Sequence, residues 1–121
     1  MFQVVFNEIS ASEMSAMSRA AQLSLLADFD VLPEELDAAE GNKFGVIERD
    51  GKRLYRHRVS DYRIYFERVP EGISVHRVLH RNTIRDFLFR ASLPMPAEDK
   101  ELSQQGRFWE LIDEGRSARK H

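Results

Sequence analysis

Residues 53–90 read RLYRHRVSDYRIYFERVPEGISVHRVLHRNTIRDFLFR, and this stretch decides the fold. It contains three runs rich in β-branched and aromatic residues, a composition typical of strands. The runs cover residues 53–59, 62–69 and 73–80. The turns between them, Ser60-Asp61 and Pro70-Glu71-Gly72, are short, and connections of this length join neighbouring antiparallel strands. The stretch therefore predicts an antiparallel meander.

Arginine recurs through the whole stretch. It holds nine arginines and no lysine against four acidic residues, which gives a formal charge of +5. Because side chains alternate between the two faces of a strand, Arg56 and Arg58 share one face, and so do Arg63 and Tyr65. A face that carries several guanidinium groups suits planar anions, and phosphate esters are the first candidate. The alternative is ordinary surface ion pairing, which contributes about 0–1 kcal/mol per pair. The excess of arginine over acid favours anion binding.

The chain before this stretch predicts one strand and a helical hairpin. Residues 2–6 form a short strand-like run. Ser10 and Glu13 match a capping box, and the helix that follows carries Met14, Met17, Ala21 and Leu25 on one stripe. A second helix starts at Pro33 and stops at Gly41-Asn42, so the hairpin covers residues 10–41. Residues 44–48 are strand-like, and Asp50-Gly51 is a tight-turn dipeptide of the kind that hairpins use.

The chain after the meander predicts two short helices. Asn82 can cap a helix that carries Ile84, Phe87 and Leu88. Pro94 and Pro96 then mark a break, and an apolar cluster at residues 108–112, bracketed by Gly106 and Gly115, predicts an amphipathic helix. We expect residues 116–121 to be frayed.

The predicted architecture is an α+β fold in which helices cover one face of the sheet and the arginine face stays open. The face of Tyr62, Ile64 and Phe66 is the one expected against the helices. Residues 1–93 would form the main domain and residues 94–121 a C-terminal extension. The extension packs on its own helix or an exposed core edge, or it folds over the basic face or forms a dimer contact.

Composition narrows the functional classes. A chain of 121 residues fits one domain, and the absence of cysteine excludes disulfides and thiolate catalysis. No ligand-like spacing of His, Asp or Glu predicts a metal, and we expect no cofactor. The net charge of −2 conceals an asymmetry, because residues 1–42 hold eight acids and one base. Apolar runs are too short to cross a bilayer and no signal peptide is evident, so a cytoplasmic location is expected.

The segment Arg58-Val-Ser-Asp-Tyr-Arg63, followed by Ile64-Tyr65-Phe66-Glu67, resembles the RelE/ParE superfamily of toxins from toxin–antitoxin systems. The family pattern is an Arg-Val-Gly-Asp-Tyr-Arg turn between two strands and then a hydrophobic-aromatic strand. A strand that ends in Gly-His-Arg and a short helix come next. Here the later piece is His80-Arg81 followed by residues 82–87. Ser60 stands where the family prefers glycine. The resemblance covers about residues 1–90 in element order.

The resemblance implies a fold and a chemistry. Ribosome-dependent members bind mRNA on the open sheet face, and the RNA 2′-hydroxyl attacks the adjacent phosphate without a metal. By position, Arg63 corresponds to the arginine that stabilises the transition state, Arg81 to a second phosphate-binding arginine and Arg56 to a basic residue on the preceding strand. Phe87 stands where some members carry a stacking tyrosine, and it can stack but cannot exchange a proton.

Proton transfer needs a further residue, because arginine is always protonated and is a poor base. The candidates are His57, His76, His80 and Tyr65, of which His80 is best placed because it adjoins Arg81 at a strand end. A structural histidine is the alternative for His80. We therefore expect catalytic roles for Arg63, Arg81 and His80, and RNA- or phosphate-binding roles for Arg56, Arg58, Tyr65, Arg77 and Phe87.

Three functions compete at this point. The first is an mRNA interferase that acts on the ribosome and is neutralised by a cognate antitoxin. The second is a ParE-like inhibitor of DNA gyrase, which Phe87 favours. The third is a non-catalytic binding module or an inactive toxin, which the near-neutral charge and the C-terminal extension favour. A homodimer is a further expectation, and fold alone cannot decide among the three.

Overall fold

The computed structural model describes residues 3–28, 44–88 and 93–121. The elements are β1 (Gln3–Phe6), α1 (Glu8–Ser15), α2 (Arg19–Asp28), β2 (Phe44–Arg49), β3 (Lys52–Val59), β4 (Tyr62–Val69), β5 (Gly72–His80), α4 (Arg81–Arg85), α5 (Met95–Ser103) and α6 (Gly106–Ser117). The predicted α+β class is confirmed. The predicted second helix of the hairpin, which starts at Pro33, lies outside the described residues.

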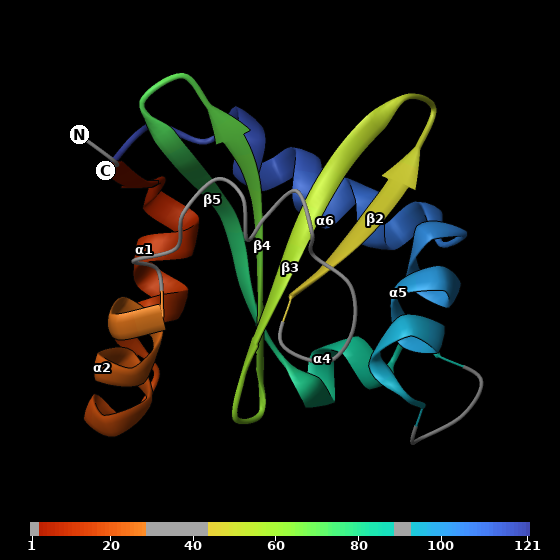
Figure 1. The fold of residues 1–121 in the computed structure, drawn as a ribbon, viewed down its shortest axis with the longest axis horizontal. Helices are drawn as coiled ribbons and strands as arrows, with labels where there is room; N and C mark the ends of the chain where they lie inside the picture. The colour runs from red at the N-terminus through yellow and green to blue at the C-terminus, as the bar shows by residue number, and fades with distance from the viewer. Residues whose placement is uncertain (1–2, 29–43, 89–92) are drawn as a thin grey trace.

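The sheet has five strands in the order β1-β5-β4-β3-β2 (Figure 1). Strands β2 to β5 pair antiparallel with their sequence neighbours, and β1 pairs parallel to β5. The tight turns adopt left-handed backbone conformations, with φ of 53° at Asp50, 79° at Gly51 and 53° at Ser60. The register of β4 and β5 shifts between Tyr65 and Phe66, which marks a bulge.

Beyond the end of β1, side chains at the start of α1 form hydrogen bonds with the backbone of β5. The Asn7 side chain donates to the carbonyls of Val75 and His76, at 3.1 and 3.0 Å, and Ser10 Oγ donates to the Val75 carbonyl at 2.9 Å. The carboxylate of Glu13 accepts from the Val78 amide at 2.9 Å. Polar residues three apart on one helix face therefore replace the missing neighbour strand.

This arrangement corrects the predicted capping box of Ser10 and Glu13. The helix begins at Glu8, and Asn7 is the N-cap whose Oδ1 accepts from the Ser10 amide at 2.8 Å. Ser10 Oγ in turn accepts from the Asn7 amide at 3.0 Å. Glu13 lies beyond the first turn of α1, and its carboxylate accepts the Val78 amide of β5 instead of capping the helix. The predicted stripe from Met14 to Leu25 is also divided between two helices, because α1 ends at Ser15 and α2 starts at Arg19.

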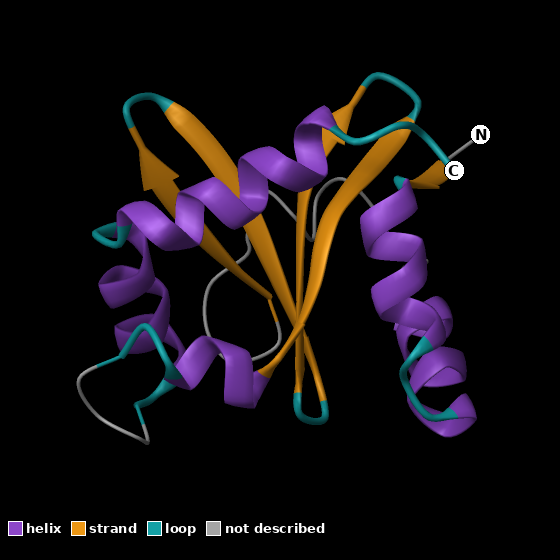
Figure 2. Ribbon diagram, turned by 180° about the vertical axis from the view of Figure 1, so that it is seen from behind, coloured by secondary structure: helices purple, strands orange, loops and turns teal. Residues whose placement is uncertain are grey.

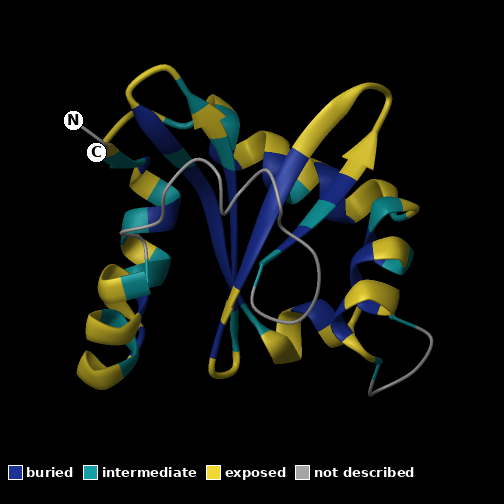
Figure 3. Ribbon diagram, viewed as in Figure 1, coloured by how far each residue is buried: buried dark blue, intermediate teal, exposed yellow. Residues whose placement is uncertain are grey.

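Both faces of the sheet are covered by helices (Figures 1 and 2). On one face, α1 and α2 pack over a core of Met17, Leu25, Tyr55, Val59, Ile64, Phe66, Ile73, Val75 and Val78. On the other face, α4, α5 and α6 pack over a second core of Ile47, Leu54, Tyr65, Leu79, Ile84, Leu102, Phe108, Trp109 and Ile112. Figure 3 shows the resulting buried centre of the sheet.

The expectation of an open arginine face is therefore wrong. The two faces are assigned as predicted, since Tyr62, Ile64 and Phe66 lie against α1 and α2. The second face, however, is occupied by the C-terminal segment, which was the alternative that the sequence left open. The amphipathic helix at residues 106–115 is confirmed as α6, whereas α5 has no counterpart among the predicted elements.

Two predictions about helix and chain ends are also corrected. The N-cap of α4 is His80 and not Asn82, because His80 Nδ1 accepts from the Asn82 amide at 3.1 Å. The C-terminus is tied down and not frayed. The Glu8 amide donates to the Arg119 carbonyl at 2.8 Å, and the His121 amide donates to the Phe6 carbonyl at 3.0 Å. Within the described residues, no helix is long and apolar enough to cross a membrane.

Candidate anion-binding site

The strand register brings four of the predicted site residues together. Arg58 on β3 lies directly opposite Arg63 on β4, and Arg56 lies opposite Tyr65. Residues directly opposite across antiparallel strands point to the same face, so all four lie on the face that α5 and α6 cover. Two guanidinium groups facing each other across a strand pair repel unless an anion lies between or beside them.

Arg56 is fully buried and binds Asp99 of α5. Its Nε and Nη2 donate to the two carboxylate oxygens of Asp99, at 3.1 and 2.8 Å, which is the planar two-bond arrangement that guanidinium also makes with phosphate. Burial raises the pKa of Asp99, and the bonds to Arg56 offset part of that rise. The ion pair is thus held inside the protein at a substantial desolvation cost.

Gly45 on β2 permits this contact. A Cβ atom at position 45 would lie 2.5 Å from Asp99 Oδ2 and 2.9 Å from Arg56 Cζ. Position 45 lies opposite Arg56 in the sheet register. Only a residue without a side chain leaves room for the pair between β2 and α5.

Arg63 and Tyr65 carry polar groups that the helices do not satisfy. Arg63 is 6% exposed, and its Nε donates to Glu98 of α5 at 3.1 Å. Its Nη1 and the Tyr65 hydroxyl have no hydrogen-bond partner among the described residues. The Tyr65 ring packs edge-on against Phe108, with ring centroids 5.0 Å apart. Burial raises the pKa of Tyr65 well above its ordinary value, so the phenol stays protonated and cannot act as a base.

Arg77 lies opposite Tyr65 on β5 and ties helices to the sheet. Its guanidinium binds Glu13 of α1 through Nη2 at 2.8 Å, and its Nη1 donates to the Leu111 carbonyl at 3.0 Å and to Glu114 at 3.3 Å. Arg77 therefore connects α1, β5 and α6. Its partners give it a structural role in this conformation, although the sequence placed it with the anion-binding residues.

The other predicted residues lie at the end of the sheet where β3, β4 and β5 meet α4. Arg58 is exposed, and Arg81 is half-exposed with Nη1 3.4 Å from Asp61. His80 is half-buried, with its ring edge-on to Tyr62 at 5.1 Å. Phe87 packs on the second core, and the Arg107 guanidinium lies 5.8 Å from its ring centre. This end is the accessible part of the predicted site.

Sequence reasoning missed the acidic partners of the site. Glu98 and Asp99 are adjacent on α5, and both are 5% exposed although their neighbours Ala97 and Lys100 are exposed. The sequence signal for these partners is complementary charge, because the acidic pair Glu98-Asp99 follows the arginine-rich strands in the chain. Nothing in the spacing alone distinguishes these acids from those of a solvated helix face.

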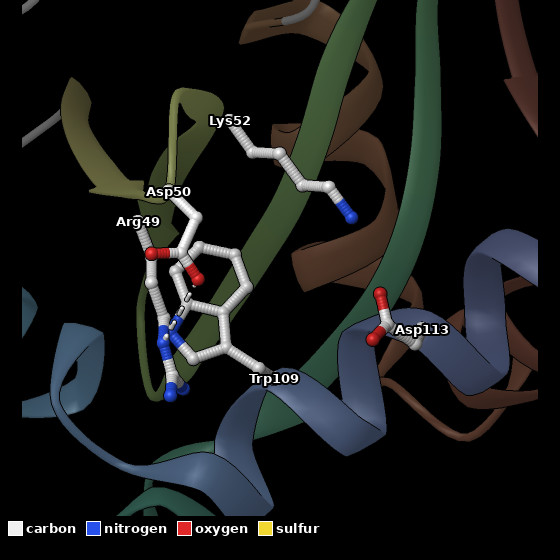
Figure 4. A pocket seen from close by; sticks show the side chains of 5 residues that line it. All are labelled: Arg49, Asp50, Lys52, Trp109 and Asp113. Carbon is white, nitrogen blue, oxygen red and sulfur yellow. Dashed lines mark ion pairs between the residues drawn. The ribbon is translucent and has the colours of Figure 1, made fainter.

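A separate pocket lies between the β2–β3 hairpin and α6 (Figure 4). It is lined by Arg49, Asp50, Lys52, Trp109 and Asp113. Arg49 and Asp50 form an ion pair at 3.8 Å, and the lining charges balance. None of its lining residues belongs to the predicted site, and balanced charge gives it no preference for an anion.

In the part of the chain that the structure describes, no group of three or more His, Asp or Glu side chains could hold a metal ion. Comparisons with protein-family models, with curated proteins and with solved structures find no significant match to this chain.

Proposed function

We propose that this protein is the toxin of a toxin–antitoxin system and cleaves mRNA by 2′-hydroxyl attack without a metal. One observation carries the proposal. Arg56 and Arg63 lie on the same face of adjacent strands, and each guanidinium binds a carboxylate. Guanidinium groups that hold carboxylates in this way also fit phosphate, and RNA offers phosphates in series. The family resemblance around Arg63 and Arg81 supplies the reaction type.

Each site residue has its own role in the proposed cleavage reaction. Arg63 stabilises charge on the phosphorane, and its Nη1 has no hydrogen-bond partner within residues 3–28, 44–88 and 93–121. Arg81 and Arg58 bind neighbouring phosphates from the exposed end of the sheet. Proton transfer falls to His80, because Tyr65 is buried and protonated. His57 lies opposite Ile64, on the face that α1 and α2 cover, and His76 lies 3.6 Å from Glu67, so neither histidine belongs to the proposed site.

The test is cleavage of mRNA on purified ribosomes by the full chain. The proposal predicts fragments that end in a 2′,3′-cyclic phosphate, formed in the presence of a metal chelator as long as the ribosomes stay intact. Arg63→Ala should abolish cleavage, whereas Arg53→Ala should retain it. Arg53 is a suitable control because it is an exposed β3 arginine paired with Glu48 at 3.0 Å. Equal cleavage by both variants would refute the assignment.

One observation favours a non-catalytic alternative, a ParE-like gyrase inhibitor or a binding module. Arg56 and Arg63 are already paired with Asp99 and Glu98, and Phe87 lacks a hydroxyl for proton exchange. A DNA supercoiling assay distinguishes this reading. Inhibition of gyrase that survives Arg63→Ala, without RNA cleavage, would replace the ribonuclease proposal.

A further inference from the structure

The contact between α5 and the sheet pairs two adjacent acids with two arginines on adjacent strands. Glu98 binds Arg63 and Asp99 binds Arg56, at 3.1 and 2.8 Å. All four side chains are at most 8% exposed. Consecutive carboxylates on α5 therefore bind the two arginines that the proposed function assigns to phosphate.

The pairing is a costly one. Burying two ions removes their hydration, and the attraction between them repays this only when every remaining donor and acceptor is satisfied. Here Arg63 Nη1 and the Tyr65 hydroxyl have no hydrogen-bond partner behind α5 among the residues that the structure describes. A phosphate has more acceptor oxygens than a carboxylate and can reach donors that α5 leaves unused.

Helix α5 is also held by fewer apolar side chains than α6. Its buried residues are Met95, Glu98, Asp99 and Leu102, so two of the four are acidic. Helix α6 instead buries Phe108, Trp109 and Ile112 in the second core. The Trp109 indole donates to the Ser103 carbonyl at 2.9 Å and links the end of α5 to α6.

We propose that α5 is an intramolecular cover, in which Glu98 and Asp99 stand in for RNA phosphates and substrate binds by displacing them. This inference rests on the proposed function and adds its regulation. The affinity of a site that is mostly covered falls in proportion to the fraction of molecules in which it is open. The isolated protein should therefore bind RNA weakly until the cover is loosened.

The experiment compares wild type with the double variant Glu98→Gln/Asp99→Asn. The control is Glu110→Gln/Asp113→Asn, which removes the same charge from the exposed side of α6. Two probes are titrated: a short fluorescent single-stranded RNA and inorganic pyrophosphate. We expect at least about tenfold tighter binding of both probes by the α5 variant, no such gain in the control, and loss of the gain when Arg63→Ala is added.

The outcomes separate the cover from the function. Equal RNA affinity in wild type and the α5 variant overturns the cover and leaves the proposed function standing. Tighter pyrophosphate binding with no RNA binding supports the cover and overturns the RNA substrate. Failure of both probes to bind the α5 variant overturns the cover as an anion stand-in.

A measurement on the wild-type chain keeps the inference falsifiable if the double variant does not fold. Hydrogen exchange of amides in residues 95–103 should speed up when saturating RNA is added, because the bound strand displaces α5. Bound RNA with unchanged or slower exchange in these residues overturns the cover.

Discussion

The substitution Asp99→Asn tests the buried ion pair directly. Arg56 has no exposed side-chain surface, and the Asp99 side chain is 7% exposed, so the guanidinium cannot recover hydration when its partner loses charge. Breaking a buried pair by removing one charge costs about 3–5 kcal/mol. Asparagine keeps one acceptor for Arg56, so we expect about 3 kcal/mol, the lower end of that range. For a chain of this length the loss corresponds to a fall in Tm of roughly 10–15 °C.

The assay is urea denaturation followed by fluorescence of Trp109, the single tryptophan. Trp109 is 7% exposed beside Phe108, with ring centroids 5.5 Å apart, so it reports on the face that α5 covers. The matched control is Glu48→Gln, which breaks the Arg53 pair at a comparable distance but with both side chains more than half exposed. The control should cost about 0–1 kcal/mol. Equal losses in the two variants would refute the reasoning that burial sets the cost.

Three further substitutions test other parts of the account. Tyr65→Phe removes a buried hydroxyl that has no hydrogen-bond partner in the described structure, so urea denaturation should show a free energy of unfolding raised by about 1 kcal/mol, and a loss of stability would reveal a partner for the hydroxyl. Ser60→Gly relieves a left-handed backbone at φ 53°, and we expect a gain of about 0.5 kcal/mol; a Tm lower than that of wild type would contradict the strain argument. Burial lowers the pKa of His76, so the unfolded state binds more protons and stability is lost as pH falls below about 6.5. His76→Gln should flatten this part of the pH profile, measured as urea midpoints at intervals between about pH 7.5 and 5, and an unchanged slope would assign it to another group.

The strands and their faces could be predicted because local patterns determine them. Alternation in residues 62–69 assigned Ile64 and Phe66 to one core, and Asp50-Gly51 marked a turn whose backbone needs positive φ. The resemblance also pointed to glycine at position 60, where Ser60 adopts a left-handed backbone. In each case neighbouring residues carry the information.

The cover on the arginine face could not be predicted in the same way. Helix α5 has a polar sequence, MPAEDKELS, and its two buried acids are explained only by the arginines that they meet on β3 and β4. The roles of Asn7 and Glu13 likewise depend on where β1 ends beside β5. Such contacts join residues far apart in the chain, so the spacing of residues within one helix or strand does not predict them.

The most direct test of the central claim is tightly induced expression in bacteria, with growth and mRNA 5′ ends recorded for three chains. The chains are wild type, Glu98→Gln/Asp99→Asn and Arg63→Ala. We predict growth arrest with new 5′ ends inside translated codons for wild type, a stronger effect at equal protein level when the α5 acids are removed, and neither effect for Arg63→Ala. Unimpaired growth and unchanged transcript ends for the first two chains, with the proteins present and folded, would contradict the account.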